Sequence, residues 1–242
     1  MNRKIVYWSN SSGDVDVVIM IGRSCCGKGT QADLIEKYAY GPSGRITTSD
    51  LIAEFETPEQ KNLRELEGKL LDGIWVAGLV CDRVQLFLDQ GKKLLILDGS
   101  ARTAEQTRAI LEFLQSNSAI RSIVAHEYDV SPEECEHRMI HNGRGRLDEE
   151  TADRRKTKLG IFDQNIWAIH RILQCMNVQT ILIKNPENRS ARWVFNESLR
   201  MNQRLNELIR SKYRFSRELE ATPLPPTPKR YWEIPSIAAM AS

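Results

Sequence analysis

The sequence predicts an α/β fold of three layers, in which a central, mostly parallel five-stranded sheet has helices on both faces. Short apolar runs alternate along the chain with segments of helical periodicity. The runs are apolar on consecutive residues rather than on every second residue. A strand that is buried on both faces has this continuous pattern, and strands joined through helices run parallel to one another.

The five expected strands follow one another along the chain, with helical segments between them. They lie at residues 15–21, 45–48, 92–99, 120–130 and 178–185. The clearest helix carries a single apolar stripe between Val76 and Leu88, at the i, i+3, i+4 spacing. Another helix is expected to begin after Ser131, because a serine N-cap followed by proline and then glutamate is a typical start.

The composition indicates in which compartment the protein is expected and which classes of partner are not expected. The chain has 242 residues, 41% of them hydrophobic, which is enough for one substantial core. A net charge of +2 does not indicate a nucleic-acid partner. No segment approaches the about 20 apolar residues of a membrane span, and the N-terminus has no secretory signal pattern. Five scattered cysteines are typical of a reducing compartment, so we expect a cytoplasmic protein. We also expect a monomer without nucleic-acid or membrane partners.

The composition also divides the chain into a domain and two flanking segments. We expect the domain at residues 14–215, after an N-terminal extension (1–13) and before a C-terminal tail (216–242). From Ala221 the sequence is rich in proline and has no period. Such a composition is typical of a mobile tail or of an extension that lies on the surface.

A glycine-rich stretch after the first strand, GRSCCGKG, has the G-x-x-x-x-G-K spacing of a phosphate-binding loop. In such a loop, successive backbone N–H groups and the next helix N-terminus bind phosphate oxygens. Gly22 and Gly27 permit the backbone to approach closely, and Lys28 supplies a mobile positive charge. The alternative is an ordinary turn with a solvated Lys28, but the flanking strand and helix patterns favour the phosphate loop. Cys25 requires a negative φ in this loop, or it stores strain.

A second group of polar residues follows the strand at 92–99, in the stretch LLILDGSARTAEQ. Asp98 ends a buried strand, where a magnesium-binding carboxylate is expected beside a phosphate loop. Arg102 can bind a phosphate through two parallel hydrogen bonds. Gln106 has two explanations from the residues alone, because it can complete a capping box with Thr103 or contact a ligand.

Arginines gather in the segment between residues 138 and 155, at Arg138, Arg144, Arg146, Arg154 and Arg155. A solvated basic face, paired with the acidic residues at 148–150, would explain them. Two glycines within the segment would allow it to move. Arginines that move beside a phosphate loop favour a second interpretation, in which they neutralise charge during phosphoryl transfer.

From about residue 15 to residue 210, the chain resembles the adenylate kinases and other nucleoside-monophosphate kinases. The matching stretches occur in the family's order: GRSCCGKGTQAD, RITTSDLI, GKLLDGIWVAGLV, LILDGSARTAEQ, and the pair SPEECEHRM and GRLDEETADRR. The fourth stretch is similar to the family signature D-G-F-P-R-x-x-x-Q. The resemblance implies a P-loop kinase domain at 14–215, with a segment that binds the monophosphate (about 48–76) and a short lid (about 138–155).

The resemblance also implies roles for individual residues. The ATP-binding residues would be Gly22, Ser24, Cys25, Cys26, Gly27, Lys28, Gly29, Thr30 and Arg138. The AMP-binding residues would be Thr48, Ile52, Leu71, Val76, Gly99, Arg102 and Gln106. The catalytic set would be Lys28, Arg102, Arg138, Arg146 and Arg155. Asp98 and Asp50 would orient Mg²⁺ through water molecules.

The implied reaction is transfer of the γ-phosphoryl group of ATP to a nucleoside monophosphate, with AMP as the expected acceptor and Mg²⁺ as the cofactor. The chain departs from the family pattern at several positions. Ala53 replaces an arginine, Ser100 and Ala101 replace phenylalanine and proline, and Asn142 replaces a lid arginine. These departures leave two alternatives open: a UMP/CMP-type kinase, and a catalytically weakened nucleotide-binding module. Arg64 or Arg144 can compensate for a lost contact.

Overall fold

The computed structural model describes residues 7–67, 69–141, 149–184 and 189–210. At its centre is a five-stranded sheet in the order β2-β3-β1-β4-β5, and every neighbouring pair is parallel. The strands are β1 (Val15–Ile21), β2 (Ser43–Thr47), β3 (Leu94–Asp98), β4 (Ile120–Asp129) and β5 (Gln179–Lys184). All five predicted strands are therefore confirmed. The second begins earlier than expected, and Thr48 belongs to the following helix.

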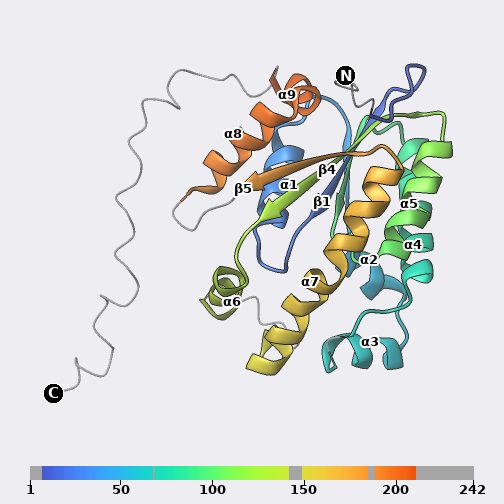
Figure 1. Cartoon of the computed structure of the whole chain (residues 1–242). Helices are drawn as coiled ribbons and strands as arrows, with labels where there is room; N and C mark the ends of the chain where they lie inside the picture. Colours follow the sequence, from blue (N-terminus) through green and yellow to red (C-terminus); the bar gives the residue numbers. More distant parts are fainter. Residues whose placement is uncertain (1–6, 68, 142–148, 185–188, 211–242) are drawn as a thin grey trace.

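Helices cover both faces of the sheet, which confirms the three-layer P-loop α/β prediction (Figure 1). One face carries α1 (Lys28–Tyr38), α6 (Pro132–His141), α8 (Ala191–Met201) and α9 (Gln203–Arg210). The other face carries α4 (Gly73–Asp89), α5 (Ala104–Ser116) and most of α7 (Ala152–Cys175). Two short helices, α2 (Thr48–Phe55) and α3 (Pro58–Glu65), connect β2 to α4. All seven residues of β1 are buried, because β1 is central and has a helical layer on each side.

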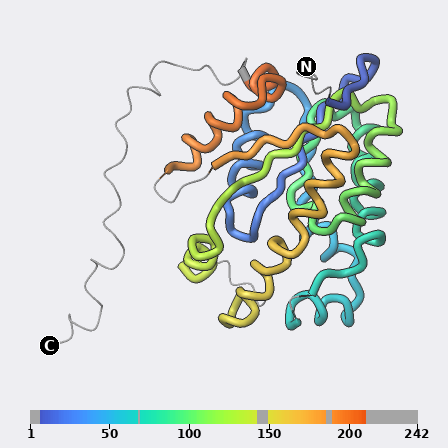
Figure 2. Tube along the Cα trace, viewed as in Figure 1, coloured from blue at the N-terminus to red at the C-terminus, as the bar shows by residue number. Residues whose placement is uncertain are grey.

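The connections after β1 and β3 leave the sheet toward opposite faces. The helix after β1, α1, packs on one face, and the helix after β3, α5, packs on the other. β1 and β3 are neighbours in the sheet, so a crevice is expected at their carboxyl ends. The trace in Figure 2 shows that the loop after β1, the helix α3, the helix α6 and the start of α7 all lie at this end.

The described part of the N-terminal extension packs onto the domain. The N–H of Trp8 donates to the carbonyl of Asn177 at 2.7 Å, and Ser9 forms an antiparallel bridge with Ser122. The predicted tail at 216–242 lies outside the described residues. Among the helices that the structure describes, none combines the length and the apolar character needed to cross a membrane.

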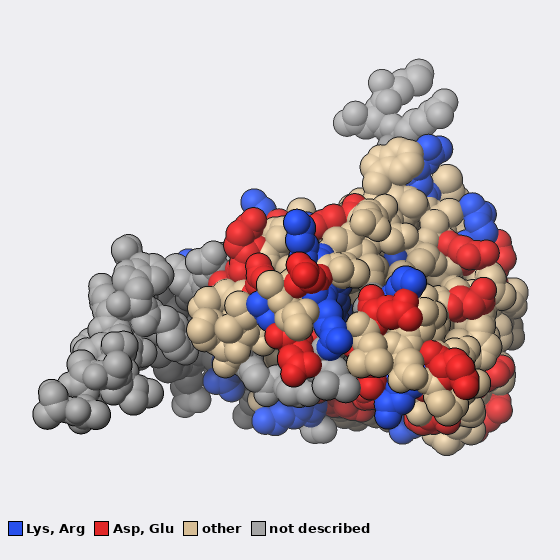
Figure 3. All heavy atoms as spheres, turned by 90° about the horizontal axis from the view of Figure 1, so that it is seen from below, with Lys and Arg blue, Asp and Glu red and all other residues tan. Residues whose placement is uncertain are grey.

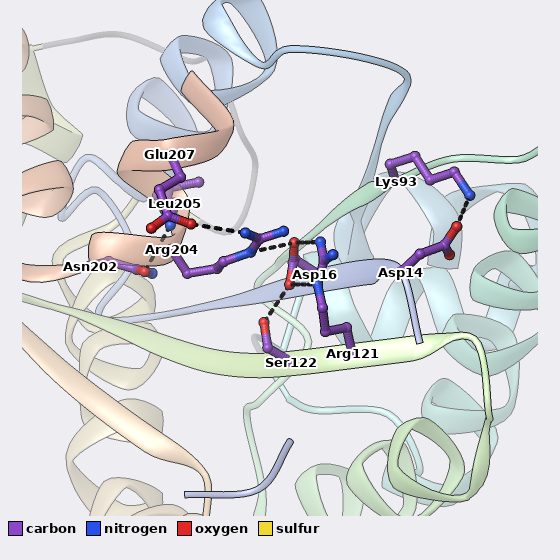
Figure 4. Close-up of polar contacts among 9 residues, drawn as sticks. All are labelled: Asp14, Asp16, Lys93, Arg121, Ser122, Asn202, Arg204, Leu205 and Glu207. Carbon is purple, nitrogen blue, oxygen red and sulfur yellow. Dashed lines mark hydrogen bonds and ion pairs between the residues drawn. The ribbon is translucent and has the colours of Figure 1, made fainter. Parts of the chain in front are cut away.

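At the amino ends of the strands, one buried carboxylate joins β1, β4 and α9 (Figure 4). Asp16 is 3% exposed and accepts hydrogen bonds from Arg121 Nε at 3.1 Å, Ser122 Oγ at 2.6 Å and Arg204 Nε at 3.1 Å. The hydrogen bond to Asp16 raises the pKa of the Arg121 guanidinium. A buried charge is tolerated only when it is paired in this way.

The junction between α8 and α9 is held by Asn202. Its Oδ1 accepts from the N–H of Leu205 at 2.9 Å, which caps α9, and its Nδ2 lies 2.8 Å from His126 Nε2 in β4. Burial lowers the pKa of His126 to about 4, so the imidazole is neutral and its Nε2 can accept this hydrogen bond. The last described helices are thus fixed to the sheet by polar contacts as well as by packing.

We predict that Asp16→Asn lowers the free energy of unfolding by about 2–3 kcal/mol, because the neutral amide cannot compensate the charges of Arg121 and Arg204. Asp14→Asn is the matched control. Asp14 is exposed and pairs with Lys93, so its loss should cost less than about 0.5 kcal/mol. Urea denaturation of both variants measures the difference. Equal effects would show that the Asp16 cluster contributes no more than a surface ion pair.

Candidate functional site

The loop between β1 and α1 leads the chain into a helix start without a side-chain cap. Gly27 is the N-cap with φ 93°, and it cannot cap through a side chain. The first N–H groups of α1 have no partners in the preceding turn, and a helix N-terminus of this kind attracts an anion. Lys28 begins the helix, and its Nζ donates to the carbonyls of Arg23 at 2.9 Å and Gly22 at 3.3 Å. Its ammonium group is therefore held over the loop.

The two cysteines of the loop face the core. Of the two outcomes expected for Cys25, a negative φ or a strained backbone, the structure has the strained one, because this residue has φ 62°. A non-glycine residue in the left-handed region costs about 1–2 kcal/mol, so the loop is strained at this point. Cys25 is 6% exposed and Cys26 is 0% exposed, and both belong to the core on the α1 side. A Cβ on Gly22 would lie 2.7 Å from Cys26 Sγ, so the packing of Cys26 requires a glycine there.

A cavity of about 490 Å³ lies at the carboxyl ends of β1, β2 and β3. Its cationic lining residues outnumber the acidic ones. The cationic residues are Lys28, Arg45, Arg64, Arg102 and Lys158, and the acidic residues are Asp33, Asp50 and Asp98. Figure 3 views the molecule from this end, where lysine and arginine side chains lie among acidic ones around the middle of the face. The electrostatic character of the cavity suits an anionic ligand.

Most of the predicted phosphate-site residues line this cavity. They are Gly22, Ser24, Cys25, Gly27, Lys28, Gly29, Thr30, Asp50, Asp98, Gly99 and Arg102. The fold therefore brings together three stretches that are far apart in the sequence: the loop after β1, the start of α2 and the turn after β3. Parallel strands place their carboxyl ends at one edge of the sheet, which is the physical reason for this convergence.

The turn after β3 is shaped by Gly99 and Arg102. Gly99 has φ 76°, and Arg102 Nε donates to its carbonyl at 2.9 Å. A Cβ on Gly99 would lie 3.2 Å from a guanidinium nitrogen of Arg102, so a side chain would crowd the arginine. Asp98 ends the strand with its side chain 8% exposed, and its Oδ2 lies 2.7 Å from Arg45 Nη2.

Several predicted acceptor-site residues are buried behind the cavity wall. Thr48 is 0% exposed, and its hydroxyl lies 2.8 Å from that of Ser100. Ser100, one of the departures from the family pattern, therefore has a hydrogen-bonding role. Ile52 and Val76 are buried in α2 and α4. Leu71 is half-buried, and its neighbour Leu70 lines the cavity in its place.

Gln106 forms only half of the expected capping box. Its N–H donates to Thr103 Oγ1 at 3.1 Å, which caps α5. Its side-chain Oε1 does not return to the Thr103 N–H but accepts from the N–H of Arg102 at 3.4 Å. Its Nε2 is buried and makes no hydrogen bond within the described part of the chain. Capping explains Thr103, whereas the amide nitrogen of Gln106 has no partner among the described residues.

Of the predicted lid arginines, Arg138 and Arg155 lie in the described part of the chain, and neither lines the cavity. Arg138 Nε lies 2.5 Å from Glu134 Oε1 within α6. Arg155 Nη1 donates to the carbonyls of Glu149 at 3.1 Å and Glu150 at 3.2 Å, near the start of α7. Arg146 lies outside the described residues, as do Asn142 and Arg144.

The cavity also includes residues that the sequence did not single out. Arg45 pairs with Asp98, and Lys158 Nζ lies 2.7 Å from Glu149 Oε1. Phe162 lines the cavity from α7, with the Arg23 guanidinium 5.1 Å from its ring centroid. Helical periodicity places Lys158 and Phe162 four residues apart on one face of α7, but only the packing of that helix brings them to the phosphate loop.

The oxygen atoms of the cavity suit a magnesium ion bound mainly through a ligand. Within the described ranges, no group of three or more His, Cys, Asp and Glu residues is placed to hold a metal ion. Mg²⁺ needs no such cage, since it keeps several waters and uses one or two carboxylates together with substrate phosphates. Asp98, Asp50 and the Thr30 hydroxyl supply donors of this type at the cavity wall.

Comparison with known proteins finds adenylate kinases among the relatives of this chain. An adenylate kinase from Coxiella burnetii is 36% identical over 139 residues, which cover 53% of this chain and 56% of the relative. Over this half of its length, the chain is similar to an adenylate kinase. An adenylate kinase from a Nitratiruptor species is 29% identical over 130 residues, covering 52% of this chain and 66% of the relative. The chain thus spans between half and two thirds of the length of these relatives. No family model matches it.

Proposed function

We propose that the protein is a magnesium-dependent phosphotransferase that moves the γ-phosphoryl group of ATP to a nucleoside monophosphate. We propose AMP as the acceptor, which gives two molecules of ADP. The observation that carries the proposal is that Lys28, Asp98 and Arg102 line one cavity. The similarity to adenylate kinases supports the same reaction. A cytoplasmic location and a monomeric state stay predictions.

Two phosphate subsites follow from this arrangement. The loop after β1, with the N–H groups of α1 and the Lys28 ammonium, would hold the outer phosphates of ATP. The Arg102 guanidinium, on the turn after β3, would bind the phosphate of the acceptor. Phosphoryl transfer requires little covalent chemistry from the protein, so positioning and charge neutralisation supply most of the catalysis. Mg²⁺ would neutralise charge on the phosphate oxygens, with Asp98 and Asp50 orienting its waters.

The reaction would also require Arg138 and Arg155 to move. Both are held by carboxylate or carbonyl oxygens outside the cavity. A phosphate can replace such partners, because it offers stronger, charged acceptors. We infer that α6 and the start of α7 approach the cavity when nucleotides bind, which would exclude water and suppress hydrolysis.

The buried amide of Gln106 favours AMP over UMP as the acceptor. An unpaired buried donor costs about 1–3 kcal/mol, and a ligand that supplies the missing acceptor would recover this cost. Adenine offers an acceptor nitrogen beside an exocyclic amino group, which complements a side-chain amide. Cytosine offers the same pair of groups, whereas uracil offers a ring N–H between two carbonyl oxygens, so this amide favours AMP or CMP over UMP, and the transfer assay decides between AMP and CMP.

A second candidate function is nucleotide binding with little turnover. Ala53 is exposed on α2 and offers no charge. Arg64, which lines the cavity and could replace the lost arginine, is tied to Glu56 by hydrogen bonds of 2.8 and 2.6 Å. An assay with ATP, Mg²⁺ and each of AMP, CMP, UMP and GMP separates the candidates. Transfer to AMP supports the proposal, whereas binding without transfer to any acceptor supports the second candidate.

We predict that Lys28→Ala and Arg102→Ala each lower kcat/KM by at least about 100-fold, because both remove charge from the phosphate subsites. Lys37→Ala on α1 and exposed Arg108→Ala on α5 are the matched controls, and should lower it less than about twofold. The coupled assay measures activity, and circular dichroism checks the fold. Near-normal activity of either site variant would remove that residue from the proposed site.

We predict that Gln106→Leu raises KM for AMP by about tenfold or more, the cost of one lost polar contact, with less than a twofold change in KM for ATP. KM for each monophosphate is compared in the same assay. Thr103→Ala is the control, since it removes the cap of α5 and leaves the Gln106 amide in place. An equal rise of KM in both variants would mean that Gln106 acts through the helix start.

A further inference from the structure

Arg45 is the residue in the cavity that pairs with the candidate magnesium-site carboxylate. Its Nη2 lies 2.7 Å from Asp98 Oδ2, and its Nη1 donates to Asp33 of α1. The side chain of Arg45 is 19% exposed and that of Asp98 is 8% exposed. The guanidinium therefore bridges β3 and α1 at the wall of the cavity.

The sheet register explains why Arg45 reaches Asp98. Thr47 of β2 pairs with Asp98 of β3, and Arg45 lies two residues before Thr47 on the same face. Diagonal neighbours of this kind are within reach of a long side chain. α1 packs over the same face, where Asp33 meets the other end of the guanidinium. The contact thus depends on β2 and β3 being neighbours.

The ion pair lies beside the start of α1. A Cβ on Gly29 would be 3.5 Å from Arg45 Nη2 and 3.7 Å from Asp98 Oδ2. Gly29 is the second residue of α1, next to Lys28. The pair therefore lies within a few ångströms of the backbone that would hold phosphate. Burial lowers the pKa of Arg45, but the hydrogen bonds and charges of Asp98 and Asp33 outweigh it and raise the pKa, so the residue stays charged.

We propose that Arg45 is a positioning residue that neutralises Asp98 when no metal is bound, so that the site binds nucleoside triphosphate with or without magnesium. The inference rests on the proposed function. An uncompensated Asp98 would repel the phosphates of a metal-free nucleotide across a short distance in a partly buried site. When Asp98 is paired with Arg45, its negative charge is neutralised and this repulsion is absent. When a metal–nucleotide binds, its cation and Arg45 compete for the same carboxylate.

The test compares the dissociation constants of ATP measured by titration calorimetry in EDTA and in saturating Mg²⁺. Arg45→Gln leaves Asp98 uncompensated. It should raise the metal-free constant by about tenfold and change the magnesium constant by less than about threefold. Arg83→Gln is the control, because Arg83 pairs with Glu54 at 2.6 Å outside the cavity lining. It should change neither constant.

The double variant Arg45→Gln with Asp98→Asn separates positioning from direct phosphate binding. It removes both charges of the pair, so its metal-free constant should stay within about threefold of the wild type. It also leaves no unpaired buried carboxylate, and so decides the question even where Arg45→Gln does not fold. A double variant that loses metal-free ATP as strongly as Arg45→Gln overturns the inference, since Arg45 would then contact phosphate itself.

An Arg45→Gln variant with an unchanged ratio of the two constants also overturns the inference. If the wild type still transfers phosphoryl groups to a monophosphate, the proposed function survives that result. A wild-type protein that binds ATP in neither condition overturns the proposed function together with the inference.

Discussion

The start of α1 is the constraint on which the rest of the site depends. Its first backbone N–H groups have no partner in the preceding turn, and Gly27 offers no side chain to cap them. β1, buried on both faces, fixes where this helix starts relative to β3, and the sheet then delivers Asp98 and Arg102 to the same cavity. The strained Cys25 and the close packing of Cys26 against Gly22 are consequences of the same tight turn.

The amino and carboxyl ends of the sheet differ in how their charged side chains are paired. At the amino end of the sheet, Asp16 is fully satisfied by Arg121, Ser122 and Arg204, so the cluster stabilises the fold and leaves nothing for a ligand. At the carboxyl end, cationic side chains outnumber acidic ones around an open cavity. Unbalanced charge beside water can be kept for a ligand, whereas unbalanced charge in a core cannot.

The departures from the adenylate kinase pattern have different structural consequences. Ser100 is used, since its hydroxyl pairs with that of Thr48 in the core. Ala101 lines the cavity, and its small side chain leaves the wall open. Ala53 is exposed and has no positive charge at the position where the family has an arginine. Arg64 does not replace that charge in this arrangement, because it is hydrogen-bonded to Glu56. The substitutions therefore bear on α2 and on the turn after β3 more than on the loop after β1.

The sequence by itself determined the five strands and the glycine-rich turn between β1 and α1, because apolar runs and glycine spacing are local signals. It did not determine the Arg45–Asp98 pair, the Thr48–Ser100 hydrogen bond or the place of Lys158 and Phe162 in the cavity. Each of these depends on which strands are neighbours or on how α7 packs, and such contacts join residues far apart in the chain. The tertiary structure also decided that Arg138 and Arg155 pair outside the cavity. The sequence shows where positive charges lie along the chain, but it does not show which oxygen atoms they contact in the fold.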